Sequence, residues 1–360
     1  MPRGASESFP EPPAPRTVTV PGPAPKSLYV RLPNWLGDLI LAWRVVETAG
    51  AEGAVFAGRA AFEPLVRARF PASPYIAVSR RGRYTAAGSL RALQPAAALL
   101  LTDSFSSALL AALARIPRRI GYAAEGRGFL LTTRVPRAGR ARSVPRFAEY
   151  RELGEAAGLR VPPGEPALRA TPEEKALGAA RLAAAGLGGA AVLVLAPGAA
   201  YGPAKQWGAE RFAAVGGHLA RRRGVALAIV GAAGDVTAAA ETARLAAAAG
   251  ARVANIAGAT SMGELVGIVD AAAAVVSNDS GVMHLAAALG RPTVGVFGST
   301  SPVWTASGAS WVANLYAEYP CSPCFRRTCP IGYGCLRSIE AEEGLRAVEA
   351  LLGRAASVAG

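Results

Sequence analysis

The stretch that most constrains the fold is residues 277–300, SNDSGVMHLAAALGRPTVGVFGST. An apolar run from Ala271 to Val276 precedes it, and Val282 to Leu289 then has apolar residues at helical spacing before Gly290. A second apolar run, Thr293 to Phe297, follows within a few residues. The pattern predicts a strand, a sharp turn, a helix and a second strand, which is the repeating unit of a doubly wound α/β domain.

The turn Asp279-Ser280-Gly281 is the first candidate for a ligand site. It leaves the first backbone N–H groups of the predicted helix without partners inside that helix, and it places the positive end of the helix dipole at the carboxyl edge of the sheet. A phosphate group fits such a place. Two alternatives stay open at this point: Asp279 or Ser280 is only a helix N-cap, and His284 is a hydrogen-bonded core histidine.

Length and composition indicate two globular, soluble domains. The chain has 360 residues, of which 51% are hydrophobic and 18% charged. No segment has 18 uninterrupted apolar residues, so a transmembrane helix is not expected. The first 25 residues hold eight prolines and no apolar core of a signal peptide, so we predict a disordered tail over residues 1–26.

The formal net charge of +14 comes almost wholly from arginine, since the chain has only three lysines. An excess this large favours an anionic partner: nucleic acid, an acidic membrane surface or a phosphorylated substrate. Ten arginines lie between residues 115 and 151, among loops with proline and glycine. We predict a loop surface that meets an acidic partner, against the alternative of an ordinary solvated surface. Because no aromatic residues alternate with the arginines, we expect no nucleic acid partner.

The first predicted strand, residues 27–33, runs into the turn Asn34-Trp35-Leu36-Gly37-Asp38 and a helix over residues 39–48. Asp38 therefore lies at the first strand-to-helix turn. A carboxylate at the mouth of a cleft can act as a general base, and the alternative is that Asp38 only complements the helix dipole. Further strands alternate with helices to about residue 122, which is typical of a parallel sheet.

After a predicted linker, VPPGEPALRATP at residues 161–172, the alternation restarts as a second Rossmann-like domain. The loop PGAAYGPAKQW brings Gly198 and Lys205 to the sheet edge, and Asp235 can accept hydrogen bonds from ribose hydroxyls. For Lys205 the alternative is a plain surface residue. Neither loop matches a P-loop or G-x-G-x-x-G, so a kinase or dehydrogenase is not expected. The predicted strands of this domain before the opening stretch are residues 192–196, 225–230 and 253–256.

All four cysteines lie within one short segment as C-x2-C-x4-C-x5-C: Cys321, Cys324, Cys329 and Cys335. They can close a zinc site, pair as two disulfides or remain reduced structural thiols, and a cytosolic location disfavours the disulfides. The spacing fits no standard zinc module closely, so we favour reduced thiols and keep zinc as the alternative.

Four of these motifs together resemble glycosyltransferase family 9, and within it the type II heptosyltransferases of the lipopolysaccharide core. They are the Asn34 to Asp38 turn, the lysine loop, the 277–300 stretch and the cysteine segment 321–335. The similarity is collinear from about Leu28 to Leu352. It implies a GT-B fold, in which two Rossmann-like domains face each other across a central cleft. The implied division is an acceptor domain at 27–165, a donor domain at 166–338, and a helix within 339–360 that packs back toward the first domain.

The resemblance implies inverting transfer of L-glycero-D-manno-heptose from ADP-heptose to the first heptose of the lipopolysaccharide inner core. The acceptor would be heptosyl-Kdo-lipid A at the cytoplasmic face of the inner membrane, so the protein would be cytoplasmic and peripheral to that membrane. The implied reaction requires no cofactor. Two alternatives stay open: a family 9 enzyme that acts on another core sugar or on protein, and a non-catalytic nucleotide-sugar-binding protein. Asp38 argues against the second, because binding alone needs no acid at the cleft.

The resemblance also assigns the site residues. It makes Asp38 the catalytic base, and it makes the arginine-rich stretch the contact surface for a phosphorylated, membrane-borne acceptor. In one departure, the family often carries a histidine ahead of the tyrosine that matches Tyr150, whereas residues 143–149 hold none. The expected donor contacts are Gly198, Lys205, Asp235, Asp279, Ser280, Gly281 and His284, and the expected acceptor contacts are Arg127, Arg134 and Arg142.

Overall fold

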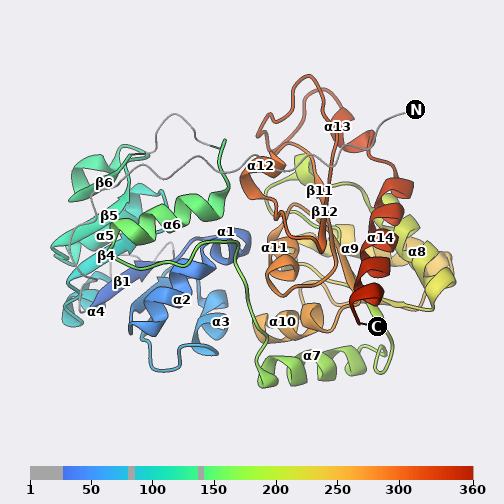
Figure 1. Cartoon of the computed structure of the whole chain (residues 1–360), viewed down its shortest axis with the longest axis horizontal. Coiled ribbons are helices and arrows are strands. Elements are labelled where there is room, and N and C mark those ends of the chain that lie inside the picture. The colour runs from blue at the N-terminus through green and yellow to red at the C-terminus, as the bar shows by residue number, and fades with distance from the viewer. Residues whose placement is uncertain (1–26, 80–85, 137–141, 360) are drawn as a thin grey trace.

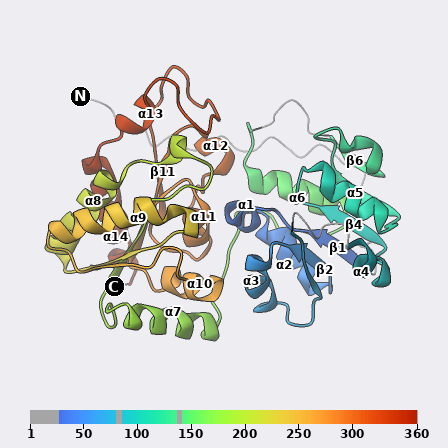
Figure 2. The same cartoon turned by 180° about the vertical axis from the view of Figure 1, so that it is seen from behind.

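The structure, a computed structural model, describes residues 27–79, 86–136 and 142–359, so the predicted tail over residues 1–26 lies outside the described residues. The chain forms two lobes side by side, and each is a parallel sheet with helices packed on it (Figure 1). Figure 2 shows the same two lobes from behind. The chain passes from the first lobe to the second between residues 157 and 171.

The sheet of the first lobe has the strand order β3-β2-β1-β4-β5-β6. Its third strand, β1 (Leu28–Arg31), is buried on both faces. Val30 joins the hydrophobic core on one face and Tyr29 the core on the other, because successive side chains of a strand point to opposite faces. The other strands are β2 (Val55–Gly58), β3 (Tyr75–Ala77), β4 (Ala97–Leu100), β5 (Arg118–Tyr122) and β6 (Thr133–Val135).

The helix predicted over residues 39–48 is in fact two helices that meet at Ala42, whose backbone leaves the helical conformation. The first of them, α1, begins earlier than predicted, so Asp38 lies in its first turn rather than before it. The helices and 3-10 turns of this lobe are α1 (Leu36–Leu41), α2 (Trp43–Ala51), η1 (Ala60–Phe62), α3 (Glu63–Arg67), α4 (Ala86–Ala92), α5 (Phe105–Leu113), η2 (Arg127–Leu130) and α6 (Arg146–Ala156).

The sheet of the second lobe has the order β12-β11-β10-β7-β8-β9. The predicted strands at 192–196 and 293–297 are confirmed to the residue, because both are buried apolar runs bounded by glycine or proline. The prediction missed β12, which is only half-buried. The strands are β7 (Val192–Ala196), β8 (Ala226–Ile229), β9 (Val253–Asn255), β10 (Ala274–Asn278), β11 (Thr293–Phe297) and β12 (Val312–Tyr316).

The last helix of the chain packs on the second lobe, away from the first (Figure 1). Its Val348 and Leu351 join the core that also holds Val215 and Leu219 of α8. The prediction that this helix packs back toward the first domain is therefore wrong, because its apolar face completes the cover of the second sheet. The helices and 3-10 turns of this lobe are α7 (Pro172–Ala184), η3 (Pro203–Lys205), α8 (Ala209–Arg223), η4 (Ala233–Asp235), α9 (Val236–Ala248), α10 (Met262–Asp270), α11 (Gly281–Ala288), α12 (Pro302–Thr305), α13 (Gly334–Arg337) and α14 (Ala341–Ala359).

Both sheets have the Rossmann strand order, so each has a point where the direction of winding reverses. These points lie between β1 and β4 in the first sheet and between β7 and β10 in the second. Ligands of such sheets bind at the carboxyl ends of the strands beside this point. Since α1 follows β1 and packs against α11, which follows β10, the two points meet between the lobes (Figure 1). The predicted GT-B arrangement is confirmed.

None of the helices in the described part of the chain combines the length and the apolar character needed to cross a bilayer.

Candidate active site between the two lobes

An ion pair joins the lysine loop after β7 to the turn after β10. The Nζ atom of Lys205 lies 2.5 Å from Oδ2 of Asp279, with side chains that are 12% and 2% exposed. Asp279 also accepts a hydrogen bond from the Thr300 hydroxyl at 2.6 Å and lies 3.4 Å from Nε2 of His284. Burial alone would raise the pKa of Asp279, but Lys205 and His284 outweigh burial and hold that pKa well below its ordinary value. Asp279 is therefore a buried anion that fixes the ammonium group of Lys205.

Asn278, the last residue of β10, holds the lysine loop in place. Its Nδ2 atom donates to the carbonyl oxygens of Pro197 at 2.7 Å and Gly198 at 3.2 Å. Its Oδ1 atom accepts from the backbone N–H of Trp207 at 3.0 Å. One buried side chain thus ties both ends of the loop to the neighbouring strand. The sequence reasoning did not single it out, since an asparagine in a turn motif has many ordinary roles.

Gly198 and Asp235, two of the predicted donor contacts, lie next to each other in the structure. A Cβ atom on Gly198 would lie 2.1 Å from Cγ of Asp235, so this position has no room for a side chain. One carboxylate oxygen of Asp235 accepts from the backbone N–H of Ala232 at 2.9 Å, which orients the group at the start of α9. Both residues lie at the carboxyl edge of the second sheet, next to the lysine loop.

Two glycines let the lobes approach each other at this edge. A Cβ atom on Gly281 would lie 2.8 Å from Cβ of Leu36, and one on Gly37 would lie 2.7 Å from Cδ2 of His284. The first turn of α1 therefore rests directly on the first turn of α11. This contact brings α1, the helix that carries Asp38, against the helix that holds Gly281 and His284.

The Asp38 carboxylate is held by two side chains of α6. Its Oδ1 atom accepts from the Tyr150 hydroxyl at 2.9 Å and lies 3.5 Å from Nε of Arg146. Burial, and next the negative charge of Asp38, raise the pKa of Tyr150 well above its ordinary value, so the phenol stays protonated and donates. The Asp38 side chain is 29% exposed, and no described residue donates to Oδ2. One oxygen is thus fixed and the other can meet a substrate.

Arg146 connects three carboxylates. Besides Asp38, its Nη1 atom lies 2.6 Å from Oε2 of Glu149 and its Nη2 atom 3.8 Å from Oδ2 of Asp103. Burial lowers the pKa of Arg146, but Tyr150, Asp38 and Glu149 together outweigh burial and raise it above its ordinary value. The guanidinium is therefore a permanent charge that links the loop after β4 to the first turn of α1. No sequence signal separates Arg146 from the other nine arginines of its stretch.

The three arginines predicted to bind the acceptor have different surroundings. Arg127 is fully buried, and it donates to the carbonyl oxygen of Tyr122 at 3.0 Å and to the Ser107 hydroxyl at 3.0 Å. The prediction that Arg127 contacts the acceptor is therefore wrong, because it has no exposed surface and instead supports the loop after β4. Arg134 is exposed on β6, the edge strand, which lies three strand positions from β1, or roughly 14 Å at the usual spacing.

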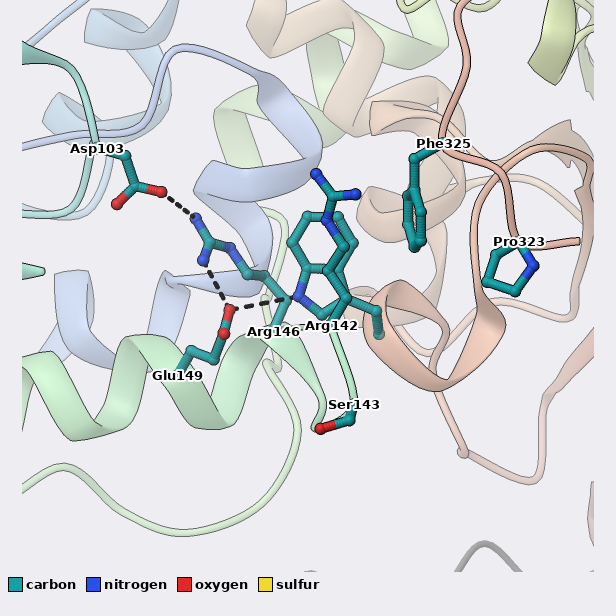
Figure 3. Close-up of a pocket in the computed structure, with 8 residues that line it drawn as sticks. Asp103, Arg142, Ser143, Arg146, Glu149, Pro323 and Phe325 are labelled. Atoms are coloured by element: carbon teal, nitrogen blue, oxygen red, sulfur yellow. Dashed lines mark hydrogen bonds and ion pairs between the residues drawn. The ribbon is translucent and has the colours of Figure 1, made fainter. Parts of the chain in front are cut away.

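Arg142, in contrast, lines a cavity of about 600 Å³ between α6 and the second lobe (Figure 3). Trp304 crosses from the second lobe and its indole N–H lies 3.3 Å from Oε2 of Glu149. Sequence reasoning missed the second-lobe side of this cavity. The lining residues are Asp103, Arg142, Ser143, Arg146, Glu149, Trp304, Pro323 and Phe325.

The four cysteines are free thiols around one small cavity. Among the residues that the structure describes, no group of three or more His, Cys, Asp or Glu side chains is placed to hold a metal ion, so the geometry gives the zinc alternative no support. The segment contacts two loops of the second lobe. The N–H of Ala204 in the lysine loop donates to the carbonyl of Arg327 at 3.1 Å, and the N–H of Phe325 donates to the carbonyl of Ser299, after β11, at 2.7 Å.

Comparison with known proteins gives matches over both lobes. Residues 83–333 match the model of glycosyltransferase family 9 (heptosyltransferase). Lipooligosaccharide heptosyltransferase 2 of Haemophilus influenzae is 34% identical over 232 residues, and lipopolysaccharide heptosyltransferase 2 of Salmonella typhimurium is 34% identical over 225. These alignments cover 62% and 60% of this chain. They span 66% and 64% of the relatives, which is just under two thirds of each.

A solved structure of similar shape is that of Escherichia coli ADP-heptose lipopolysaccharide heptosyltransferase II, with a TM-score of 0.75 and 27% identity, covering 91% of this chain and 99% of that one. The E. coli heptosyltransferase WaaC with ADP-2-deoxy-2-fluoro heptose has a TM-score of 0.64 and 18% identity, covering 90% of this chain and 99% of that one. The second likeness supports the fold alone.

Proposed function

The chain belongs to glycosyltransferase family 9, and from this premise we propose that it transfers L-glycero-D-manno-heptose from ADP-heptose to the first heptose of the lipopolysaccharide inner core. The observation that carries the proposal is the contact of Gly37 with His284, which brings the first turn of α1, with Asp38, against the helix that begins next to the Lys205–Asp279 pair. The proposed base of one lobe and the proposed diphosphate-binding cation of the other therefore both lie near the contact between the lobes. The relatives from H. influenzae and E. coli are named as heptosyltransferases, which supports heptose as the transferred sugar.

Asp38 is the proposed general base. Its Oδ2 atom removes the proton from the acceptor hydroxyl while that oxygen bonds to the anomeric carbon. The bond from the same carbon to the ADP oxygen breaks on the opposite face, so the configuration is inverted and ADP leaves with the electron pair. Tyr150 and Arg146 hold Oδ1, which keeps the carboxylate plane fixed during the transfer.

The second lobe receives the leaving group. The ammonium of Lys205 and the N–H groups of Ser280 and Gly281 at the start of α11 are the proposed partners of the diphosphate oxygens. Asp279 orients Lys205. Gly198 and Asp235 lie along the same sheet edge, where the nucleoside would extend.

The proposed acceptor also implies where in the cell the protein acts. An acceptor on lipid A at the cytoplasmic face of the inner membrane requires a cytoplasmic protein that meets the membrane surface from that side. A net charge of +14 supports this, because anionic lipids attract basic surfaces. Sedimentation with anionic vesicles at low salt, lost at high salt, is the expected result, and no sedimentation at any salt concentration would contradict it.

The test of the function is incubation with ADP-heptose and two acceptors, Kdo-lipid A with and without the first heptose, with products scored by mass. Addition of one heptose to the heptose-containing acceptor alone is the expected result. Addition to the heptose-free acceptor would place the enzyme one step earlier in the core. No addition to either acceptor would contradict the proposal.

A further inference from the structure

The cavity at α6 lies next to the proposed base but has no part in the proton transfer (Figure 3). Arg146 forms one of its walls and also contacts Asp38, so the cavity opens beside the acceptor side of the reaction. Its volume of about 600 Å³ is that of an ordinary small-molecule site. The walls come from both lobes: α6 and the residues before it on one side, α12 and the cysteine segment on the other.

Arg142 is the available cation of this cavity. Its guanidinium lies 4.0 Å from the ring centroid of Phe325 and 5.3 Å from that of Trp304. No carboxylate of the described residues forms an ion pair with it, whereas the charge of Arg146 is matched by three carboxylates. A guanidinium that stacks on rings keeps its N–H edge available, and that edge fits a phosphate or a carboxylate in bidentate fashion.

The aromatic wall is fixed by contacts on the second lobe. The rings of Trp304 and Phe325 pack edge to face, with centroids 6.0 Å apart and an angle of 80° between them. The backbone N–H of Phe325 donates a hydrogen bond to the carbonyl oxygen of Ser299, and the carbonyl oxygen of Phe325 accepts one from the hydroxyl of Tyr201 in the lysine loop. Flat aromatic surfaces beside carboxylates suit a sugar, which presents C–H groups on its faces and hydroxyls at its rim.

We propose that this cavity is a subsite for an acceptor sugar that carries a phosphate or carboxylate group, with Arg142 binding the anion and Trp304 and Phe325 supporting the ring. The proposal rests on the proposed function in that the bound sugar belongs to the glycosyl acceptor. It makes acceptor recognition a property of both lobes. It also gives the cysteine segment a role, because that segment carries Phe325.

The first experiment compares Arg142→Met with Arg67→Met in the full chain. Methionine keeps the packing on Phe325 and removes the charge, and Arg67 is an exposed arginine on α3, paired with Glu63, outside the cavity. With heptosylated Kdo-lipid A as acceptor, Arg142→Met should raise the acceptor KM by about 10- to 100-fold and change the ADP-heptose KM by less than about twofold. An acceptor KM that rises no more than in Arg67→Met would overturn the proposal.

Modified acceptors identify the anion. The same assay uses acceptor stripped of phosphate, acceptor with its carboxylates reduced to alcohols, and acceptor treated in both ways. The group whose removal abolishes the difference between wild type and Arg142→Met is the group that Arg142 binds. A difference that persists with the doubly treated acceptor would mean that Arg142 recognises no anion, and the proposal would fail.

Direct binding separates this proposal from the proposed function. Calorimetry with the delipidated acceptor saccharide, without donor, should give binding to wild type and Arg67→Met, and weaker binding to Arg142→Met and Phe325→Leu. ADP affinity should be unchanged in all four proteins, which also verifies that each variant is folded. Saccharide binding without heptose transfer would contradict the proposed function and leave the subsite standing. Equal binding by all variants, or no binding to wild type, would refute the subsite.

Discussion

Replacing Asp279 by asparagine tests whether this residue is the anion that fixes Lys205. The substitution keeps the shape of the side chain and removes its charge. The ammonium group of Lys205, whose side chain is 12% exposed, then has no carboxylate partner in this pair. Removing one partner of a buried ion pair costs about 3 to 5 kcal/mol. Because Lys205 also lies 5.0 Å from the ring centroid of Tyr201, which retains some favourable contact, we expect the lower end, about 3 kcal/mol.

The measurement is a double-mutant cycle on the free energy of unfolding, from urea denaturation of wild type, Asp279→Asn, Lys205→Met and the double variant. The double variant should be more stable than the sum of the single effects predicts, by about 2 to 3 kcal/mol. Additive effects would refute the pairing, and so would an Asp279→Asn protein as stable as wild type at pH 7.

The pH dependence gives an independent check with a defined sign. The folded pKa of Asp279 lies below that of an aspartate in the unfolded chain, which is about 3.9. The stabilisation is therefore fully present above about pH 4 and is lost as the pH falls from there toward the folded pKa. The stability difference between wild type and Asp279→Asn should be constant from about pH 5 to 8 and shrink at lower pH. A difference that grows on acidification would contradict the assignment.

Three further substitutions test other parts of the site. Asp38→Asn should lower kcat by about 10²- to 10⁴-fold, while calorimetry still detects ADP-heptose binding. Near-normal turnover would show that Asp38 is not the base, and Asp103 would become the next candidate. Tyr150→Phe removes the hydrogen bond to the Asp38 carboxylate, and a hydrogen bond to a charged group contributes about 1.5 to 3 kcal/mol. We therefore expect kcat to fall by roughly 10- to 100-fold with little change in the melting temperature. An unchanged kcat would show that Asp38 does not depend on this hydrogen bond. Cys324→Ser should keep turnover within about twofold, since no described histidine contacts the thiol, and a folded variant without turnover would place the cysteine segment in the chemistry.

The meeting of Gly198, Lys205 and Asp279 at one sheet edge could be predicted from the sequence, because it depends on local pattern and on one general property of parallel sheets. Apolar runs bounded by glycine or proline located β7 and β11, and the carboxyl ends of adjacent parallel strands lie at one edge. Gly198, Lys205 and Asp279 each follow a strand end, so their approach in the fold follows once the strands are assigned. Asn278 was not predicted, because it holds both ends of the lysine loop from the neighbouring strand, a contact that no local pattern specifies.

The contacts around α6 could not be predicted in the same way, because they depend on the relative placement of two sheets. Arg127 and Arg146 belong to one arginine-rich stretch, yet the first is buried beneath the loop after β4 and the second bridges three carboxylates. Trp304 lies 155 residues beyond Glu149 in the chain and contacts it across the cleft. Likewise, the amphipathic pattern of α14 predicts that one face of this helix is buried, but it does not predict which lobe the helix packs on. Side chains that follow strand ends inherit their positions from the sheet, whereas those that meet between lobes depend on an orientation that is fixed only by close contacts such as Gly37 on His284.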